Sequence, residues 1–154
     1  MRIECLYNEP EYAGVVANFI YNEFVVTTNN NSSLEKIIEK FRNTKQNEFP
    51  ITFIAIEDNK CVGTISIFKN DLKTQNDLTP WLSALYVEPN YRKRGIAENL
   101  ITTVLHKVKD LGYKTIYLRT EHTADYYKKL GWSFEKEAID ERGQATEVYK
   151  YDVV

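Results

Sequence analysis

Hydrophobic residues recur along the chain with two periods, and these periods predict alternating strands and helices. Between residues 96 and 111 they return every three or four positions, which is the spacing of one face of an α-helix. Gly112 follows that run, where a helix-ending glycine is expected. Residues 81–87 form an apolar, β-prone run, and Pro89 ends it because proline cannot donate a hydrogen bond to a sheet. The central stretch therefore predicts a strand, a turn and an amphipathic helix.

The same patterns predict further elements on both sides of this stretch. Before it we expect a strand, a helix, a polar loop over residues 27–33, a second helix that Ser32 and Glu35 would cap, and a hairpin. After it we expect a strand, a short helix and a closing hairpin. The expected strands cover residues 2–7, 51–57, 61–69, 81–87, 115–119, 132–138 and 146–153, and the expected helices cover residues 9–24, 33–44, 96–111 and 123–130.

This order of elements predicts an α/β protein of mixed (α+β) type, in which a mixed sheet carries helices on both faces. With 154 residues the chain is long enough to bury a core and short enough for one unit, so we expect a single domain over residues 1–154. Hydrophobic residues make up 43% of the chain and charged residues 27%, which places it among ordinary globular proteins.

The charge balance and the apolar runs argue against two classes of partner. The formal net charge is −2, so there is no bulk basicity to recruit nucleic acid. No apolar run approaches the roughly 20 residues that span a bilayer, and the N-terminal residues lack the apolar core of a signal peptide. We therefore expect a cytoplasmic protein, monomeric or homodimeric, that binds neither nucleic acid nor membranes. Cys5 and Cys61 are expected to be free thiols there, and their spacing does not suggest a metal site.

A basic turn joins the central strand to the central helix. The first amides of a helix have no partners within the helix, and the helix dipole adds about half a positive charge at that end. Arg92, Lys93 and Arg94 add full charges, Gly95 lets a ligand approach the backbone closely, and Ala97 is small. The turn therefore predicts an anion site suited to a diphosphate, with a merely solvated basic turn as the alternative.

Arg92-x-x-Gly95-x-Ala97 resembles the Q/R-x-x-G-x-G/A signature of the GNAT superfamily of acetyl-CoA-dependent N-acetyltransferases. Residues 86–92 (YVEPNYR) look like the lead-in to that signature, and residues 127–132 (YKKLGW) resemble the family's Y-E-K-L-G-F ending, in the family's order and spacing. The resemblance covers essentially the whole chain. It implies a GNAT-like fold, with a splayed mixed sheet of about seven strands whose central strand and following strand part to admit the pantetheine arm.

The resemblance also implies that acetyl-CoA is the cosubstrate and indicates which residues hold it. Backbone groups of Leu85 and Val87 would pair with the pantetheine arm as an added strand does, and the amide of Val87 would face the thioester oxygen. Thr120 stands where the family often has an asparagine that contacts the pantetheine. The expected binding residues are Leu85, Val87, Arg92, Lys93, Arg94, Gly95, Ile96, Ala97, Thr120 and Tyr127.

Tyr127 matches the family's general-acid tyrosine by its place in the motif. A free thiol has a pKa of about 8.5 and a phenol one of about 10, so a tyrosine held close to the leaving thiolate can protonate it. The alternative is a half-buried tyrosine that packs under the sheet. Neighbouring Tyr126 would point elsewhere, because successive helical residues are turned by about 100°. The expected catalytic residues are therefore Tyr127 and Val87.

The general base and the acceptor site are the least determined parts of the prediction. Family members often carry a carboxylate on the central strand, but residues 81–87 contain none. Glu23 and Asp71 lie on segments that border the acceptor cleft in the family's fold, so they are the candidate substrate-binding residues. For each of them an ordinary surface carboxylate is the alternative.

Together these patterns predict an N-acetyltransferase that moves an acetyl group from acetyl-CoA to a primary amine of a small molecule or peptide. The alternative is a GNAT-fold module that binds coenzyme A without catalysis, and the presence of Tyr127 and of the phosphate-binding turn argues against it. A nucleotide enzyme of another class is remote, because the chain has neither a Walker-type loop nor a G-x-G-x-x-G motif.

Overall fold

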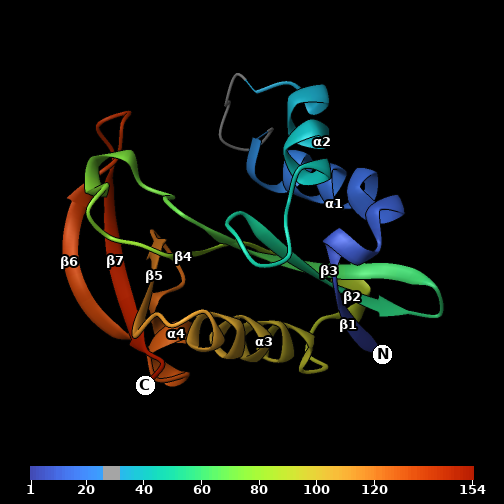
Figure 1. Cartoon of the computed structure of the whole chain (residues 1–154). Coiled ribbons are helices and arrows are strands. Elements are labelled where there is room, and N and C mark those ends of the chain that lie inside the picture. Colours follow the sequence, from blue (N-terminus) through green and yellow to red (C-terminus); the bar gives the residue numbers. More distant parts are fainter. Residues whose placement is uncertain (26–31) are drawn as a thin grey trace. The chain divides into compact units, whose positions relative to one another are not determined.

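The structure is a computed structural model that describes residues 1–25 and 32–154. Its strands pair in the order β1-β2-β3-β4-β5-β7-β6 (Figure 1). Strands β4 and β5 are parallel, whereas β1 with β2, β5 with β7, and β6 with β7 are antiparallel, so the predicted mixed sheet is confirmed. The strands are β1 (Arg2–Cys5), β2 (Ile51–Glu57), β3 (Lys60–Phe68), β4 (Trp81–Val87), β5 (Thr115–Thr120), β6 (Ser133–Ile139) and β7 (Ala145–Asp152); the helices are α1 (Ala13–Ile20), α2 (Leu34–Arg42), α3 (Ile96–Asp110) and α4 (Ala124–Lys129).

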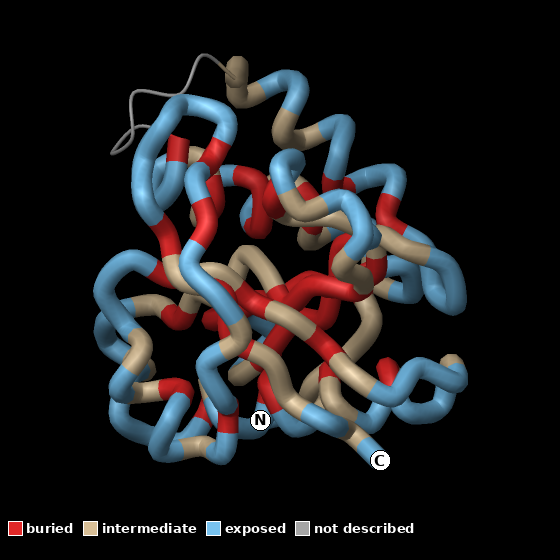
Figure 2. The backbone as a smooth tube through the Cα atoms, turned by 90° about the vertical axis from the view of Figure 1, so that its left-hand side faces the viewer, coloured by how far each residue is buried: buried red, intermediate tan, exposed pale blue. Residues whose placement is uncertain are grey.

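The chain forms two compact units. The first unit contains residues 1–66 and 84–104, and the second unit contains residues 67–83 and 105–154. The division runs through β3, β4 and α3, so these three elements contribute to both units. A single domain over residues 1–154 stays a prediction, and so does the cleft between β4 and β5 that the resemblance implies. Strands β2 and β3 are buried along almost their whole length, whereas other parts of the tube in Figure 2 are exposed over long stretches.

The first unit is built around an apolar cluster that α1 and α2 share with β2 and β3. Its completely or almost completely buried members include Val16, Ala17, Phe41 and Ile54. Helices α1 and α2 cover one face of these strands, and the start of α3 lies against the other (Figure 1). The hairpin between β2 and β3 turns at Asp58 and Asn59, which both adopt left-handed backbone angles, as a two-residue turn of this kind requires. The predicted hairpin is thus confirmed.

The second unit is built around β5, β7 and β6. Strand β5 pairs with β7 along its whole length, and β4 joins β5 at the pair Trp81 and Tyr117. Trp81 is completely buried, and its indole donates to the carbonyl of Leu78 at 2.6 Å. Leu72, Ala138 and Val148 complete the apolar cluster around it.

A buried carboxylate closes the turn between β6 and β7. Asp140 accepts hydrogen bonds from the backbone amides of Arg142 and Gln144, each at 2.9 Å, and from the guanidinium of Arg119 at 3.3 Å. The bond from Gln144, together with that from Arg142 and the charge of Arg119, holds the pKa of Asp140 below its ordinary value despite burial. The predicted turn of the closing hairpin is present, and an interaction that the sequence did not reveal fixes it.

The N-terminal helix differs from the prediction for residues 9–24. Pro10–Tyr12 form a separate 3₁₀ turn, α1 covers only Ala13–Ile20, and Tyr21–Val25 wind into a π-helical turn. The break before Pro10 has a local cause, because Glu9 has φ −135° and ψ 57° and so cannot continue a helix. Leu6–Asn8 form another 3₁₀ turn, which ends the first strand at Cys5 and not at residue 7.

The N-cap of the second helix lies one residue later than predicted. The N-cap of α2 is Ser33, whose extended backbone lets its hydroxyl accept a hydrogen bond from the amide of Lys36 at 3.2 Å. Most of the predicted polar loop, residues 27–31, lies outside the described residues. In the described part of the chain, no helix combines the length and the apolarity that a bilayer span requires.

Candidate active site

The turn between β4 and α3, called the phosphate loop below and comprising residues 92–97, lies wholly in the first unit. A 3₁₀ turn, Pro89–Tyr91, leads into it, and α3 begins at Ile96. Lys93 and Gly95 adopt left-handed backbone angles, with φ of 63° and 80°. The first helical hydrogen bond runs from the amide of Asn99 to the carbonyl of Gly95 at 3.0 Å. The amides of residues 96–98 therefore have no acceptor within the helix and can bind an anion.

Gly95 leaves open space beside this loop. A Cβ atom placed on Gly95 would have no heavy atom within 4 Å, whereas one placed on Gly63 would lie 3.2 Å from the carbonyl oxygen of Tyr86. A side chain at position 63 would therefore be crowded, whereas packing leaves room for one at position 95. The left-handed φ favours glycine at position 95, and the empty space beside it lets a ligand reach the backbone. The assignment of the diphosphate of acetyl-CoA to this loop stays a prediction.

Arg92 ties the loop to the end of β4. Its Nε donates to the carbonyl of Val87 at 2.7 Å, and its guanidinium lies 5.5 Å from the centre of the Tyr86 ring. Tyr86 also stacks on Phe19 of α1, with ring centres 4.9 Å apart. The sequence did not single out Tyr86, although it occupies a hydrophobic position of the lead-in to the motif.

Arg94 ties the loop to the β2–β3 hairpin. Its guanidinium donates to the carboxylate of Glu57 at 3.1 Å and lies 5.3 Å from the centre of the Tyr91 ring. The ammonium of Lys60, which begins β3, lies 5.7 Å from the same ring. Residues from β2, from β3 and from the turn after β4 therefore meet around one tyrosine.

The middle of β4 carries a backbone outlier. Ala84 has a φ of 56°, which is rare for a residue with a side chain and marks a strained position. Leu85 and Val87 follow it, the first half-buried and the second buried. The amide of the next residue, Glu88, donates to the carbonyl of Val62 at 2.8 Å, so the exit of the strand is fixed. The roles of Leu85 and Val87 toward the pantetheine arm and the thioester stay predictions.

Tyr127 lies in α4 of the second unit, among aromatic rings. The centre of its ring is 5.2 Å from that of Tyr126 and 5.8 Å from that of Trp132, and both contacts are edge-to-face. The side chain is buried, and this burial, with a smaller contribution from Tyr126, raises the pKa of Tyr127 to about 12. These surroundings match the packed tyrosine that was the alternative prediction, and they also keep the phenol protonated at neutral pH.

Thr120 ends β5, and its hydroxyl is engaged in the turn that leads to α4. It accepts hydrogen bonds from the amides of Thr123 at 2.9 Å and His122 at 3.3 Å. It also lies 2.6 Å from the hydroxyl of Thr123. The structure therefore shows a local role for Thr120, and its expected contact with the pantetheine stays a prediction.

The two candidate acceptor residues lie in different units. Glu23 is exposed on the π-helical turn of the first unit, where its charge contributes to a raised pKa of Tyr86 whose main cause is burial. Asp71 is half-buried after β3 in the second unit. Their roles toward an amine stay predictions. Within the described residues, no cluster of three or more histidine, cysteine or acidic side chains could hold a metal ion.

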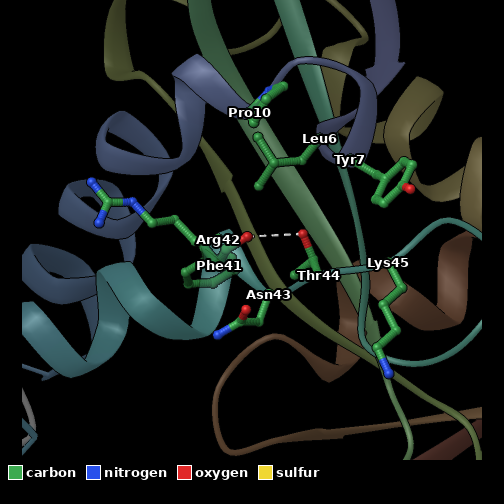
Figure 3. A pocket seen from close by; sticks show the side chains of 8 residues that line it. All are labelled: Leu6, Tyr7, Pro10, Phe41, Arg42, Asn43, Thr44 and Lys45. Atoms are coloured by element: carbon green, nitrogen blue, oxygen red, sulfur yellow. Dashed lines mark hydrogen bonds between the residues drawn. The ribbon is translucent and has the colours of Figure 1, made fainter.

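A cavity of about 480 Å³ lies elsewhere in the first unit (Figure 3). The side chain of Thr44 within it donates to the carbonyl of Phe41 at 2.9 Å, which satisfies the end of α2. None of the predicted site residues lines this cavity, so its size does not make it the active site. Its lining residues are Leu6, Tyr7, Pro10, Phe41, Arg42, Asn43, Thr44 and Lys45.

The comparison with protein families identifies the class to which this fold and this loop belong. The family model described as "Acetyltransferase (GNAT) family" matches residues 17–132, a range that includes both the phosphate loop and the Tyr127 motif. The chain therefore belongs to the acetyltransferase (GNAT) family. This confirms the predicted resemblance to the GNAT family.

Individual relatives agree with that assignment. Human (Homo sapiens) N-acetyltransferase 8 is 30% identical over 91 residues, which cover 53% of this chain and 40% of that protein, so the chain spans less than half the length of this relative. An aminoglycoside 6'-N-acetyltransferase crystallised with coenzyme A superposes with a TM-score of 0.79 at 18% identity, over 100% of this chain and 98% of that one. The corresponding enzyme from Enterococcus faecium gives a TM-score of 0.76 at 19% identity, over 100% and 98%. At these identities the structures confirm the fold alone.

Proposed function

We propose that this chain is an N-acetyltransferase that moves the acetyl group of acetyl-CoA to a primary amine of a small molecule or a peptide. The observation that carries the proposal is the phosphate loop. A backbone site for a diphosphate is supported by the left-handed Lys93 and Gly95, by the open space beside Gly95, and by the amides at the start of α3, which have no acceptor within the helix.

The reaction requires one bond to form and one to break. Acetyl-CoA supplies a thioester, whose carbonyl carbon bonds to the amine nitrogen as the bond to sulfur breaks; the amine loses a proton and the thiolate gains one. In this proposal the amides of the phosphate loop bind the diphosphate, and backbone groups of Leu85 and Val87 align the pantetheine arm. The amide of Val87 faces the thioester oxygen, where negative charge develops.

Tyr127 would donate the proton to the sulfur. Since its pKa is raised to about 12, the phenol keeps its proton throughout the physiological range. A free thiol has a pKa of about 8.5, so its thiolate is too weak a base to take that proton readily. The role therefore requires the sulfur to lose its hydration as well, because desolvation raises the pKa of a thiol as it raises that of a phenol.

The acceptor is proposed as a class. Glu23 and Asp71 are acidic, and a carboxylate at an acceptor site favours a cationic amine. Aminoglycosides are a rational choice for a first panel, because two of the structural neighbours are aminoglycoside acetyltransferases by name. We also propose that the protein is cytoplasmic and that it is a monomer or a homodimer.

Two measurements test the proposal. Calorimetry should show that acetyl-CoA binds, and a thiol-release assay with aminoglycosides, simple amines, amino acids and peptides should show turnover with at least one amine. Absence of acetyl-CoA binding would contradict the proposal. Tight binding without thiol release across the whole panel would favour the non-catalytic coenzyme A module instead.

A further inference from the structure

We infer that the three cations of the phosphate loop have different tasks: Lys93 contacts the diphosphate of acetyl-CoA, while Arg92 and Arg94 are positioning residues that hold the loop in shape. The inference rests on the proposed function, because it concerns the same site. From the sequence alone, all three cations were expected to bind the cosubstrate. The structure separates them by the partners that each side chain already has.

Arg92 is held by the strand that precedes the loop. The hydrogen bond from its Nε to the carbonyl of Val87 is short, at 2.7 Å, and the guanidinium lies over the ring of Tyr86. A planar guanidinium can donate a hydrogen bond and stack on a ring at the same time, which an ammonium cannot do in the same way. Arg92 thus fixes the direction in which the chain leaves β4.

Arg94 is held by the hairpin between β2 and β3. Its ion pair with Glu57 is 3.1 Å long, and the Glu57 side chain is only 21% exposed, so the charge of Arg94 already has a counter-charge. The Tyr91 ring adds a second contact at 5.3 Å. Arg94 therefore holds the phosphate loop to the β2–β3 hairpin, at the residue before Gly95.

Lys93 lies between these two anchors and differs from both. Across residues 1–25 and 32–154, no hydrogen bond, ion pair or aromatic contact engages its exposed side chain. Its left-handed backbone precedes the open space at Gly95 by two residues. An ammonium group on a flexible stem acts as a point charge and suits a phosphate whose exact position varies. Lys93 is accordingly the side chain able to meet the diphosphate without breaking an existing contact.

Charge-conserving substitutions distinguish the two tasks. Lys93→Arg should bind coenzyme A about as well as the wild type, because a positive charge is sufficient there. Arg92→Lys should lose affinity almost as Arg92→Gln does, because an ammonium cannot replace both contacts of the guanidinium. Lys93→Gln should weaken binding by about three- to tenfold at low salt, the size expected for one charged contact.

Salt provides the second readout. Charge attraction is screened at high ionic strength, so the penalty of Lys93→Gln should shrink between about 0.02 M and about 0.5 M salt. The penalties of Arg92→Gln and Arg94→Gln should persist, because they arise from loss of loop shape. Lys109→Gln, which removes an exposed charge from the end of α3, is the control and should bind as the wild type does.

The experiment is calorimetric titration of the folded variants with coenzyme A at both salt concentrations, with circular dichroism as the check of folding. The result that would overturn the inference is full affinity of Arg92→Lys together with no effect of Lys93→Gln. Should an arginine variant fail to fold, Lys93→Gln and Lys93→Arg still decide the role of Lys93. If the wild type binds no coenzyme A, both the proposed function and this inference are overturned. If the wild type binds coenzyme A, the results for the variants test this inference alone.

Discussion

The phosphate loop of the first unit and the surroundings of Tyr127 in the second unit contrast in almost every physical respect. The loop is exposed and cationic, and its chemistry resides in backbone amides and in the left-handed angles of Lys93 and Gly95. Tyr127 is buried among aromatic rings, and its chemistry resides in one hydroxyl group. One region leaves its backbone open to solvent, while the other encloses a titratable group.

The contrast shows how differently the two regions should respond to substitution. A backbone site tolerates changes of side chain as long as the loop keeps its shape and its open space. A site that depends on one hydroxyl tolerates no loss of that group but keeps its packing when a similar ring replaces it. Four experiments, from the largest expected effect to the smallest, test this difference.

Gly95→Glu should abolish acetyl-CoA binding. The new side chain would fill the open space beside the loop, and its negative charge would repel the diphosphate. A residue with a Cβ at φ 80° also costs the fold about 1–2 kcal/mol. Calorimetry with acetyl-CoA measures the result.

The matched control is Gly143→Glu. Gly143 has a φ of 79° and equally open space, but it lies in the turn between β6 and β7. It should lower stability by a similar amount and leave acetyl-CoA binding intact. Unchanged affinity in a folded Gly95→Glu variant would remove the phosphate loop as the binding site.

Tyr127→Phe should lower kcat by about 10²–10⁴, the usual range for loss of a general acid. The ring and its contacts with Tyr126 and Trp132 are kept, so acetyl-CoA affinity should change little. The measurement is steady-state kinetics with an acceptor from the amine panel. Tyr126→Phe is the neighbouring control and should be mild. If Tyr127→Phe keeps the wild-type kcat while chemistry limits the rate, Tyr127 is a packing residue and water is the proton source.

Alkaline pH should weaken the fold through Tyr127. Because burial raises its pKa from 10.0 to about 12, the folded state holds the phenol proton more tightly than the unfolded state does. The resulting stabilisation, about 2–3 kcal/mol, is complete below pH 10 and is lost as the pH rises toward 12. Ionisation of the Cys61 thiol in the first unit should also lower the stability of the fold, between pH 9 and 11, since burial raises the pKa of Cys61 from 9.0 to about 11.

Urea unfolding at a series of pH values measures this effect. Tyr127→Phe has no phenol to ionise, so its stability should decline less steeply than that of the wild type between pH 10 and 12. Identical slopes for the two proteins would show that Tyr127 is solvated in the folded state.

Thr120→Val should lower the free energy of unfolding by about 1–2 kcal/mol, because two backbone amides lose their acceptor. If the turn is its main task, acetyl-CoA affinity should stay close to that of the wild type. A clear loss of affinity without loss of stability would establish the predicted pantetheine contact. Thr103→Val serves as the control. Among the described residues, the hydroxyl of Thr103 bonds only to the carbonyl of Asn99 within α3, so its removal should cost little.

Some elements follow closely from the pattern of hydrophobic residues in the sequence. Strand β4 matches the expected residues 81–87, and α3 differs from the expected helix by one residue at its end. The hydrophobic period did not predict the bounds of the N-terminal helix. It continues across residues 9–24, although the backbone angles of Glu9 lie outside the helical range. A helix cap was also misplaced by one position, since the spacing of Ser32 and Glu35 favoured Ser32 whereas the N-cap is Ser33.

The candidate site was predictable where a motif fixes it and not where contacts between distant residues fix it. The position of the phosphate loop follows from the spacing of Arg92, Gly95 and Ala97. The partners of the arginines do not, because Glu57 and Arg94 are 37 residues apart and only the fold brings them together. Likewise, the hydroxyl of Thr120 has competing local partners that the motif position does not reveal.

The left-handed conformation of Ala84 affects how stable the fold would be with glycine at this position. Replacement by glycine would relieve about 1–2 kcal/mol of backbone strain. It would also remove a methyl group that packs against the core of the first unit, worth about 0.8 kcal/mol, and add about 0.5–1 kcal/mol of chain entropy to the unfolded state. These terms nearly cancel. Selection for stability is therefore almost indifferent between alanine and glycine at this position.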